Sequence, residues 1–284
     1  MSNVRTWRTL LAEATEALGS DNDARWMVEE AAGMTRAELV VHLDDQVTAR
    51  CGAHLTQMVE RRLAGEPLQY VLGHWGFRDL DLMVDRRVLI PRPETEQVVG
   101  WALDEVAPDV ELVAADLGTG SGAIALALAR ALPRAMVWAT DVSRDALEVA
   151  GANTAGAGMW AARRVRLAEG WWWDALPAEL RGRVDLAVSN PPYVADDEAL
   201  PPEVDVWEPR LALRSGGDGL DAIKELVGMA GTWLAPGGVL VIEIAPVHDT
   251  VVVELALSGG AAKAEVRVDV LGRPRALVAR WPGG

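Results

Sequence analysis

The stretch "ADLGTGSGAIALALA", residues 115–129, decides the fold. A predicted strand leads into Asp116, and glycines at 118, 120 and 122 then open a predicted helix rich in alanine and leucine. Glycine lets backbone N–H groups approach a ligand closely, and the first turn of a helix carries a partial positive charge. An ordinary glycine-rich turn would show the same pattern. The spacing is not the G-x-G-x-x-G of dinucleotide-binding proteins, and the lysine of a P-loop is absent.

The same alternation of strand and helix continues to the end of the chain. It predicts strands at 112–117, 135–140, 164–169, 184–189, 237–245, 264–270 and 275–281, and helices at 122–132, 143–153, 218–234 and 247–258. Such alternation is typical of a mostly parallel α/β sheet with helices on both faces. The last two strands are joined only by "LGRP", so we expect them to pair antiparallel.

Residues 1–66 carry the signals of several helices. A helical apolar face ends at Gly19, Thr35 and Glu38 have the spacing of a capping box, and a further helix ends at Gly65. Residues 67–92 are short, extended and partly alternating, which favours a β-hairpin connector. The chain is therefore predicted to comprise a helical domain (1–66), a hairpin connector (67–92) and a large α/β domain (93–284).

Composition limits the possible functions. Half of the 284 residues are hydrophobic, 24% are charged and the formal net charge is −15, so we expect a soluble globular protein that repels nucleic-acid phosphates. Cys51 is the only cysteine, which excludes an internal disulfide and a cysteine-built zinc site. The N-terminal stretch lacks a signal-peptide core, and no later stretch has the length of a membrane span, so a cytoplasmic location is expected.

Two further positions lie at predicted strand ends. Asp141 follows the glycine turn by about 20 residues, where an acidic side chain can accept hydrogen bonds from both ribose hydroxyls. It could instead cap the helix that begins near Ser143. The stretch "EGWWWDAL", residues 169–176, places aromatic rings at the next strand end, where one could stack on a purine. The three tryptophans could equally fill core and surface.

The strongest local signal is "SNPPY", residues 189–193. The strand at 184–189 delivers Asn190 to the carboxyl edge of the sheet, where such sheets bind ligands. Pro191 and Pro192 lack N–H groups and hold their carbonyl oxygens in fixed directions. A carboxamide oxygen and a backbone carbonyl can together bind both hydrogens of a planar –NH₂ group, and Tyr193 can lie over that group. A proline-rich loop without function is the alternative.

Together these motifs resemble a class I S-adenosylmethionine-dependent methyltransferase that acts on a planar nitrogen. The stretches "EPLQYVLGHWGF", "VLIPRPETE", "WEPRLAL" and "GGDGLDAI" narrow the resemblance to the release factor glutamine N5-methyltransferases, over nearly the whole chain. The resemblance implies a seven-stranded, mostly parallel, Rossmann-like sheet. It also implies that the substrate is the glutamine of the Gly-Gly-Gln motif in class-1 peptide chain release factors.

The resemblance assigns roles to particular residues. Asp141 would bind the ribose of S-adenosylmethionine and Trp172 would face its adenine. Asn190 would touch both the cofactor and the substrate amide, with Pro191, Pro192 and Tyr193 completing the amide pocket. The remaining cofactor contacts would come from the glycine turn, namely Asp116, Gly118, Thr119, Gly120, Ser121 and Gly122. We expect catalysis chiefly by positioning, with no metal, no nucleic-acid or membrane partner, S-adenosylhomocysteine as by-product, and a monomeric enzyme.

The sequence departs from the family at three places. Trp171 stands where an acidic residue is usual, Pro274 where a polar or acidic residue is common, and the segment "EIAPVHDT", residues 243–250, is atypical. Two other functions fit parts of the pattern. An adenine-N6 nucleic-acid methyltransferase could use the same N-P-P-Y motif, but it would need a basic face and a pocket for a flipped base. A non-catalytic scaffold would explain the departures but not the intact motif.

Overall fold

The computed structural model describes residues 5–283, whose contacts form two units. One unit extends to His74 and includes Pro202–Trp207, and the other comprises Trp75–Pro201 and the chain from Glu208 onward. Residues 1–4 of the predicted helical domain and Gly284 lie outside the described residues.

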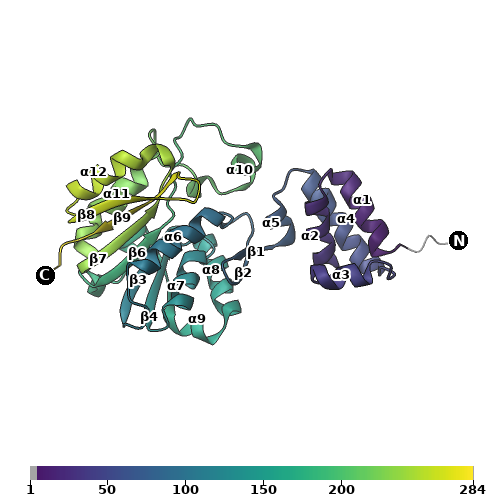
Figure 1. Ribbon diagram of the computed structural model, residues 1–284, viewed down its shortest axis with the longest axis horizontal. Helices are drawn as coiled ribbons and strands as arrows, with labels where there is room; N and C mark the ends of the chain where they lie inside the picture. The colour runs from purple at the N-terminus through teal and green to yellow at the C-terminus, as the bar shows by residue number, and fades with distance from the viewer. Residues whose placement is uncertain (1–4, 284) are drawn as a thin grey trace. The chain divides into compact units, whose positions relative to one another are not determined.

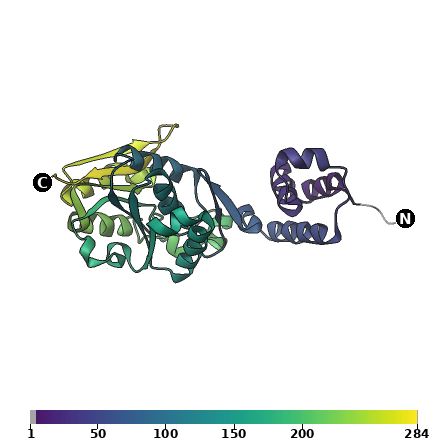
Figure 2. The ribbon, with the colours of Figure 1, turned by 90° about the horizontal axis from the view of Figure 1, so that it is seen from below.

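The first unit is helical, as predicted. Gly19, with φ +64°, ends its first helix, and Thr35 and Glu38 form the predicted capping box. Leu10, Met27 and Met58 are buried in its core. Its helices are α1 (Trp7–Leu18), α2 (Asp21–Ala32), α3 (Arg36–His42), α4 (Ala49–Leu63), α5 (Leu68–Leu72) and α10 (Pro202–Trp207). The N-terminal helices are drawn in purple to blue in Figure 2.

The segment 67–92 differs in part from the prediction. Residues 68–72 form helix α5 rather than an extended strand, because Pro67 directly precedes a buried apolar run that Gly73 ends at φ +84°. Five residues are too few for helical and alternating patterns to be told apart. The predicted hairpin is present as a two-stranded sheet of β1 (His74–Phe77) and β2 (Leu80–Met83).

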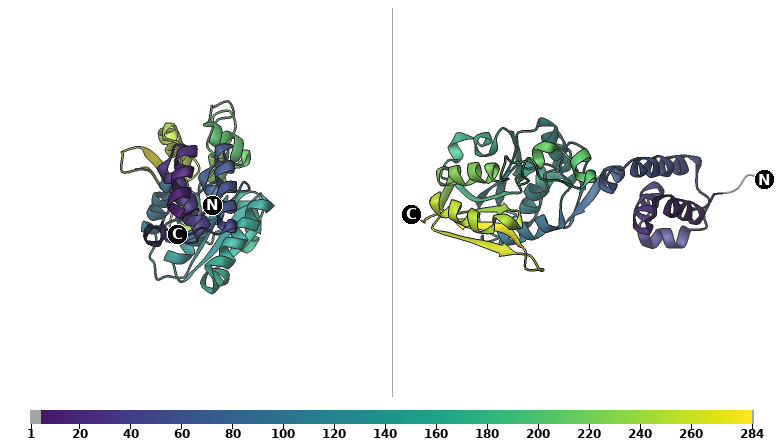
Figure 3. Two further views of the ribbon diagram at one scale, coloured as in Figure 1. Left: turned by 90° about the vertical axis from the view of Figure 1, so that its right-hand side faces the viewer. Right: turned by 90° about the horizontal axis from the view of Figure 1, so that it is seen from above.

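A seven-stranded sheet forms the centre of the second unit (Figure 1). Its order is β5-β4-β3-β6-β7-β9-β8, and the pairs along β5 to β7 are parallel. The last strand, β9, pairs antiparallel with both neighbours, which confirms the prediction for the chain end. The strands are β3 (Leu112–Leu117), β4 (Ala135–Asp141), β5 (Val165–Glu169), β6 (Val184–Ser189), β7 (Leu234–Glu243), β8 (Lys263–Val268) and β9 (Pro274–Arg280). The β8–β9 turn protrudes from the sheet, with Val270 90% exposed (Figure 3).

Each face of the sheet has its own buried apolar cluster. Ala114 and Leu186 belong to the cluster that α6, α7 and α9 cover, whereas Ala115 and Ala187 belong to the cluster that η1, α11 and α12 cover. The alternation along β3 and β6 therefore buries both faces, as in α/β proteins with a parallel sheet. The helices are α6 (Pro93–Asp104), α7 (Ala123–Ala131), α8 (Arg144–Ala157), α9 (Met159–Arg164), η1 (Trp172–Ala175), α11 (Asp221–Trp233) and α12 (Asp249–Ser258). Helix α9 was not predicted.

This topology fixes where a ligand can bind. Strand β3 lies between β4 and β6, so the connections that leave β3 and β6 run to opposite sides of the sheet. The gap that this reversal leaves at the carboxyl ends of the strands is the usual ligand site of open α/β sheets. Within residues 5–283, no helix has both the length and the apolar character needed to cross a lipid bilayer.

Candidate functional site

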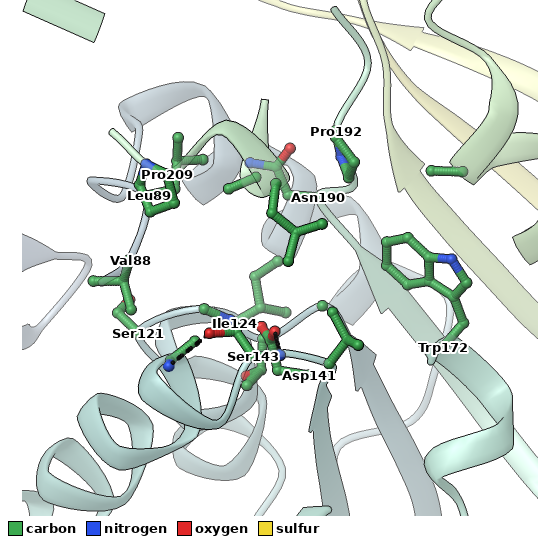
Figure 4. Close-up of a pocket in the computed structure, with 18 of the residues that line it drawn as sticks. Val88, Leu89, Ser121, Ile124, Asp141, Ser143, Trp172, Asn190, Pro192 and Pro209 are labelled. Atoms are coloured by element: carbon green, nitrogen blue, oxygen red, sulfur yellow. Dashed lines mark hydrogen bonds between the residues drawn. The ribbon is translucent and has the colours of Figure 1, made fainter. Parts of the chain in front are cut away.

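A cavity of about 390 Å³ opens at this end of the sheet, within the second unit. That volume is within the range of small-molecule and cofactor sites. Figure 4 shows Asn190 and Pro192 on one side of the cavity and Asp141 and Ser143 on the opposite side. The ends of β3, β4 and β6, which sequence analysis identified separately, therefore meet around one space.

The glycine turn after β3 forms part of the cavity wall. The N–H groups of Gly118 and Thr119 donate to the Thr140 carbonyl on β4, at 2.9 and 2.8 Å. Gly118 has φ +81°, and a Cβ placed on it would lie 2.9 Å from a ring carbon of Trp172. Residues 118–121 line the cavity, while Gly122 packs against Ala150 of α8. Only glycine at 118 allows this close approach of the backbone to the indole.

Asp116 is fully buried beneath the turn rather than on the cavity wall. Its Oδ2 accepts hydrogen bonds from Thr119 Oγ1 at 2.5 Å and from the Ala125 N–H at 2.9 Å. Burial raises the pKa of this carboxyl to about 7. Asp116 thus ties the turn to the first residues of α7, and its direct contact with a cofactor stays a prediction.

Asp141 lies at the end of β4 and lines the cavity. Its Oδ2 accepts from the Gly120 N–H and its Oδ1 from the Ser143 N–H, both at 2.9 Å. The N-cap of α8 is Ser143, not Asp141, because Ser143 Oγ accepts from the Ala146 N–H. Burial raises the pKa of Asp141. The carboxylate therefore holds the glycine turn in place and keeps further lone pairs for a ligand.

The three consecutive tryptophans have three different environments. Trp173 is fully buried, donates to the Leu226 carbonyl at 2.9 Å and stacks on Trp233. Trp172, with φ +45°, packs against Gly118, and its ring lies at the cavity wall (Figure 4). Trp171 is 45% exposed and donates from Nε1 to Glu225 of α11; both side chains line the cavity. One tryptophan thus belongs to the core and two to the site.

Asn190 begins the loop directly after β6. Its Nδ2 donates to Thr95 Oγ1 at 3.1 Å, and its side chain lines the cavity together with Pro192. Pro191 is buried, and the half-buried Tyr193 places its hydroxyl 3.5 Å from Glu243 Oε1. Burial raises the pKa of the Tyr193 phenol, and the charge of Glu243 adds to the effect.

The residues behind this loop were not predicted from the sequence. Thr95 Oγ1 donates to Glu243 Oε2 at 2.6 Å, and both residues are almost completely buried. Burial raises the pKa of Glu243 to about 7. Thr95 belongs to "IPRPETE", so this motif could have identified Thr95 as a site residue from the sequence. Glu243 opens the segment that sequence analysis treated only as atypical.

A second loop, residues 208–220, supports the first. Val194 exchanges backbone hydrogen bonds with Leu213 and Ser215, at 3.0 and 2.9 Å. Gly219 lies so close to the Tyr193 carbonyl oxygen that a Cβ would be 2.4 Å from it. On its other side, His248 Nε2 lies 3.1 Å from the Asp218 carbonyl oxygen. Residues 243–250 therefore contact the loop region of Asn190 both directly and through this turn.

The cavity fits a nucleoside-containing cofactor in three respects. It has a half-buried acidic side chain at a strand end, a glycine turn in its wall, and an indole ring packed against that turn.

Known proteins are similar in sequence to both parts of the chain. The family model described as "PrmC N-terminal domain" matches residues 4–73, and the "Methyltransferase small domain" model matches residues 103–207. A release factor glutamine methyltransferase from Moorella thermoacetica is 43% identical, covering 96% of this chain and 98% of its own. One from Streptomyces coelicolor is 44% identical, covering 95% and 98%.

The fold is also found in solved structures. The crystal structure of a methyltransferase from Pyrococcus furiosus has a TM-score of 0.54 at 18% identity, covering 81% of this chain and 100% of its own. That likeness concerns the fold alone. Sequence identity above 40% over nearly the full length is what assigns the chain: it belongs to the release factor glutamine methyltransferase family.

Proposed function

We propose that this protein transfers a methyl group from S-adenosylmethionine to the side-chain amide nitrogen, N5, of a glutamine in class-1 peptide chain release factors, within their Gly-Gly-Gln motif. The observation that carries the proposal is the position of Asn190, whose carboxamide lies on the cavity wall opposite Asp141. A cofactor on Asp141 and an amide on Asn190 would thus share one cavity.

Residues around the cavity suit the parts of the cofactor. Asp141 would accept from the ribose hydroxyls, residues 118–121 would surround the methionine part, and the Trp172 indole would face the adenine. Trp171 cannot accept a hydrogen bond from an adenine amino group, since its only polar atom is a donor. Glu225, which Trp171 contacts through Nε1, presents a carboxylate at the same wall. Glu225 would therefore supply the acceptor that the usual acidic residue at 171 provides in the family.

When bound, the cofactor supplies an electrophilic methyl group on a sulfonium. An amide nitrogen is a weak nucleophile because its lone pair is delocalised into the carbonyl. Asn190 Oδ1 and the Pro191 carbonyl would accept the two amide hydrogens, which turns the nitrogen toward the cofactor and excludes other orientations. Alignment of this kind can lower an activation barrier by about 7–11 kcal/mol at most. The amide nitrogen would lose one proton to solvent during or after the transfer.

The proposal also assigns a role to each part of the chain. Residues 1–66 would recognise the release factor, residues 67–92 would connect, and residues 93–284 would bind the cofactor and carry out transfer. The family model that matches residues 4–73 supports a dedicated N-terminal domain. A monomeric state and a cytoplasmic location remain predictions from the sequence.

The proposal is tested by incubating the full chain with isotope-labelled S-adenosylmethionine and a purified release factor, followed by peptide mass mapping. We expect one added methyl group on the glutamine of the Gly-Gly-Gln motif. The variant Asn190→Ala should lose most transfer, about 100-fold or more in kcat, because it loses the side-chain acceptor for the amide. It should keep cofactor binding in part, measured by calorimetry. Near-normal turnover of Asn190→Ala would rule out this role for Asn190.

A further inference from the structure

We infer that Glu243 and Thr95 are positioning residues that fix which end of the Asn190 carboxamide faces the substrate, and so make the site accept an amide –NH₂ rather than a carbonyl or carboxylate oxygen. The inference rests on the proposed function and extends it to two residues outside the N-P-P-Y motif. Neither residue needs to touch the reacting atoms for this role.

The directions of two hydrogen bonds fix the orientation of the Asn190 carboxamide. Above a pH of about 7, the pKa of Glu243, its carboxyl is ionised and has no hydrogen to donate. The 2.6 Å contact between Glu243 Oε2 and Thr95 Oγ1 then uses the threonine's only hydroxyl hydrogen. Thr95 Oγ1 can then only accept in its contact with Asn190, at 3.1 Å. Asn190 must therefore present its Nδ2 to Thr95.

The two ends of a carboxamide point in different directions, so fixing one fixes the other. With Nδ2 directed at Thr95, the acceptor Oδ1 is left for a ligand, and among residues 5–283 it receives no hydrogen bond from the protein. An acceptor at this point can bind an N–H but repels a carbonyl or carboxylate oxygen. The site would thereby discriminate a glutamine side chain from a glutamate side chain of nearly the same shape.

The packing around the pair allows little rearrangement. Thr95 is 3% exposed and Glu243 is 1% exposed, in the first turn of α6 and at the end of β7. The second carboxylate oxygen of Glu243 is occupied by the Tyr193 hydroxyl, at 3.5 Å. The Glu243 carboxylate therefore contacts both Thr95 and Tyr193. It cannot turn toward solvent without losing both contacts.

Four variants test the inference. Thr95→Val keeps the shape of the side chain and removes the hydroxyl, whereas Thr95→Ser keeps the hydroxyl. Glu243→Gln adds a donor, which frees the Thr95 hydrogen to point at Asn190 and favours the opposite carboxamide orientation. Thr154→Val, which removes a hydroxyl bonded to the Ala150 carbonyl on α8, is the matched control.

The first readout does not depend on activity. Nuclear magnetic resonance of ¹⁵N-labelled protein follows hydrogen exchange of the Asn190 side-chain amide, assigned by its loss in Asn190→Asp. We expect slow exchange in the unmodified chain, Thr95→Ser and Thr154→Val, and exchange at least about 10-fold faster in Thr95→Val, because the Nδ2 hydrogen bond is lost. Unchanged exchange in folded Thr95→Val would overturn the inference.

The second readout is steady-state methyl transfer to a release factor. We expect kcat to fall by about 10- to 100-fold in Thr95→Val and Glu243→Gln, the usual loss when a supporting hydrogen bond is removed, with KM and cofactor Kd within about twofold. Thr95→Ser should recover to within about threefold of the unmodified chain. Equal loss in Thr95→Ser and Thr95→Val would contradict the inference, since packing rather than hydrogen bonding would then be responsible. If the unmodified chain transfers no methyl group, the proposed function fails while the exchange experiment still decides the orientation.

Discussion

Asn190 is flanked by two buried carboxyl groups, one on each neighbouring strand. Asp116 lies near the end of β3 and Glu243 at the end of β7, and β6 pairs with both strands. Burial raises the pKa of each carboxyl to about 7. Such clustering of shifted groups is typical of functional sites, because a position suited to a ligand is seldom the most stable for the protein alone.

Stability should therefore depend on pH through Glu243. Its carboxyl has a pKa of about 7 in the folded chain and about 4.3 when unfolded, so the folded state binds the proton more tightly between these values. The free energy of unfolding should fall as pH rises through this window and level off above it. The nearby Glu94 charge raises the pKa of Glu243 and Arg275 lowers it.

The measurement is urea unfolding at pH 5 and pH 8 for the unmodified chain and Glu243→Gln. The unmodified chain should lose about 1–3 kcal/mol more than the variant over this range, since one pKa unit corresponds to about 1.4 kcal/mol. Glu254→Gln, on the exposed side of α12, is the control and should follow the unmodified chain. Identical pH dependence in Glu243→Gln would show that Glu243 does not titrate in this way.

A second residue-scale prediction concerns Asp141. Asp141→Asn replaces one acceptor oxygen by an –NH₂ group that faces either the Gly120 or the Ser143 N–H, so one of two 2.9 Å hydrogen bonds is lost. We expect the Kd for S-adenosylmethionine to rise at least about 10-fold, from this loss together with the weaker ribose contact. Calorimetry checks the value. Asp145→Asn, an exposed position on α8, should bind like the unmodified chain, and an equal Kd for both variants would exclude the ribose role.

At the element scale, three separate segments hold the loop after β6. Helix α6 contributes Thr95, the turn 215–220 contributes Gly219, and the end of the β7–α12 connection contributes His248 next to that turn. This connection lies within the segment 243–250, which departs from the family pattern. The contacts of this segment indicate that it supports the loop after β6. Its departure from the family pattern therefore does not by itself indicate lost activity.

The turn provides a prediction at this scale. Gly219 has φ +74°, and a Cβ there would lie 2.4 Å from the Tyr193 carbonyl oxygen, whereas a Cβ on Gly217 would meet nothing within 4 Å. Gly219→Ala should therefore displace the loop and cost about 2–4 kcal/mol of stability, with a fall in methyl transfer. Gly217→Ala in the same turn should change stability by less than about 1 kcal/mol. Thermal unfolding and the transfer assay compare them, and equal behaviour of the two variants would contradict the close contact.

The elements themselves were largely predictable from the sequence, but their supporting contacts were not. The strands around residues 112–117 and 184–189 are apolar runs with clear ends, so β3, β6 and Asn190 lie where the pattern places them. Helix α5 was missed because a five-residue segment, LQYVL, is too short to show a period. The Asn190–Thr95 and Thr95–Glu243 bonds join residues 95 and 148 positions apart, and no local pattern encodes such pairs.

At the scale of the whole molecule, charge separates the proposed function from its main alternative. The N-P-P-Y motif suits any planar –NH₂ group, so Asn190 to Tyr193 alone do not distinguish a protein glutamine from an adenine base. The formal net charge of −15 favours the glutamine, because an enzyme of nucleic acids gains much of its affinity from phosphate contacts. Twenty-seven basic residues against 42 acidic ones leave little for such contacts.

We therefore expect the full chain to be inactive on nucleic acids under conditions in which it methylates a release factor. Adenine-containing DNA and RNA, single- and double-stranded, would be incubated with labelled S-adenosylmethionine at about 50 and 150 mM salt, and fluorescence anisotropy would measure binding. Binding driven by phosphate contacts is strongest at low salt. An absence of binding at the lower salt concentration is therefore the stronger evidence against a nucleic-acid substrate. Label in N6-methyladenine would contradict the assignment to a protein substrate. Label only in the release factor would support selection of the substrate by contacts outside the amide pocket, such as those proposed for residues 1–66.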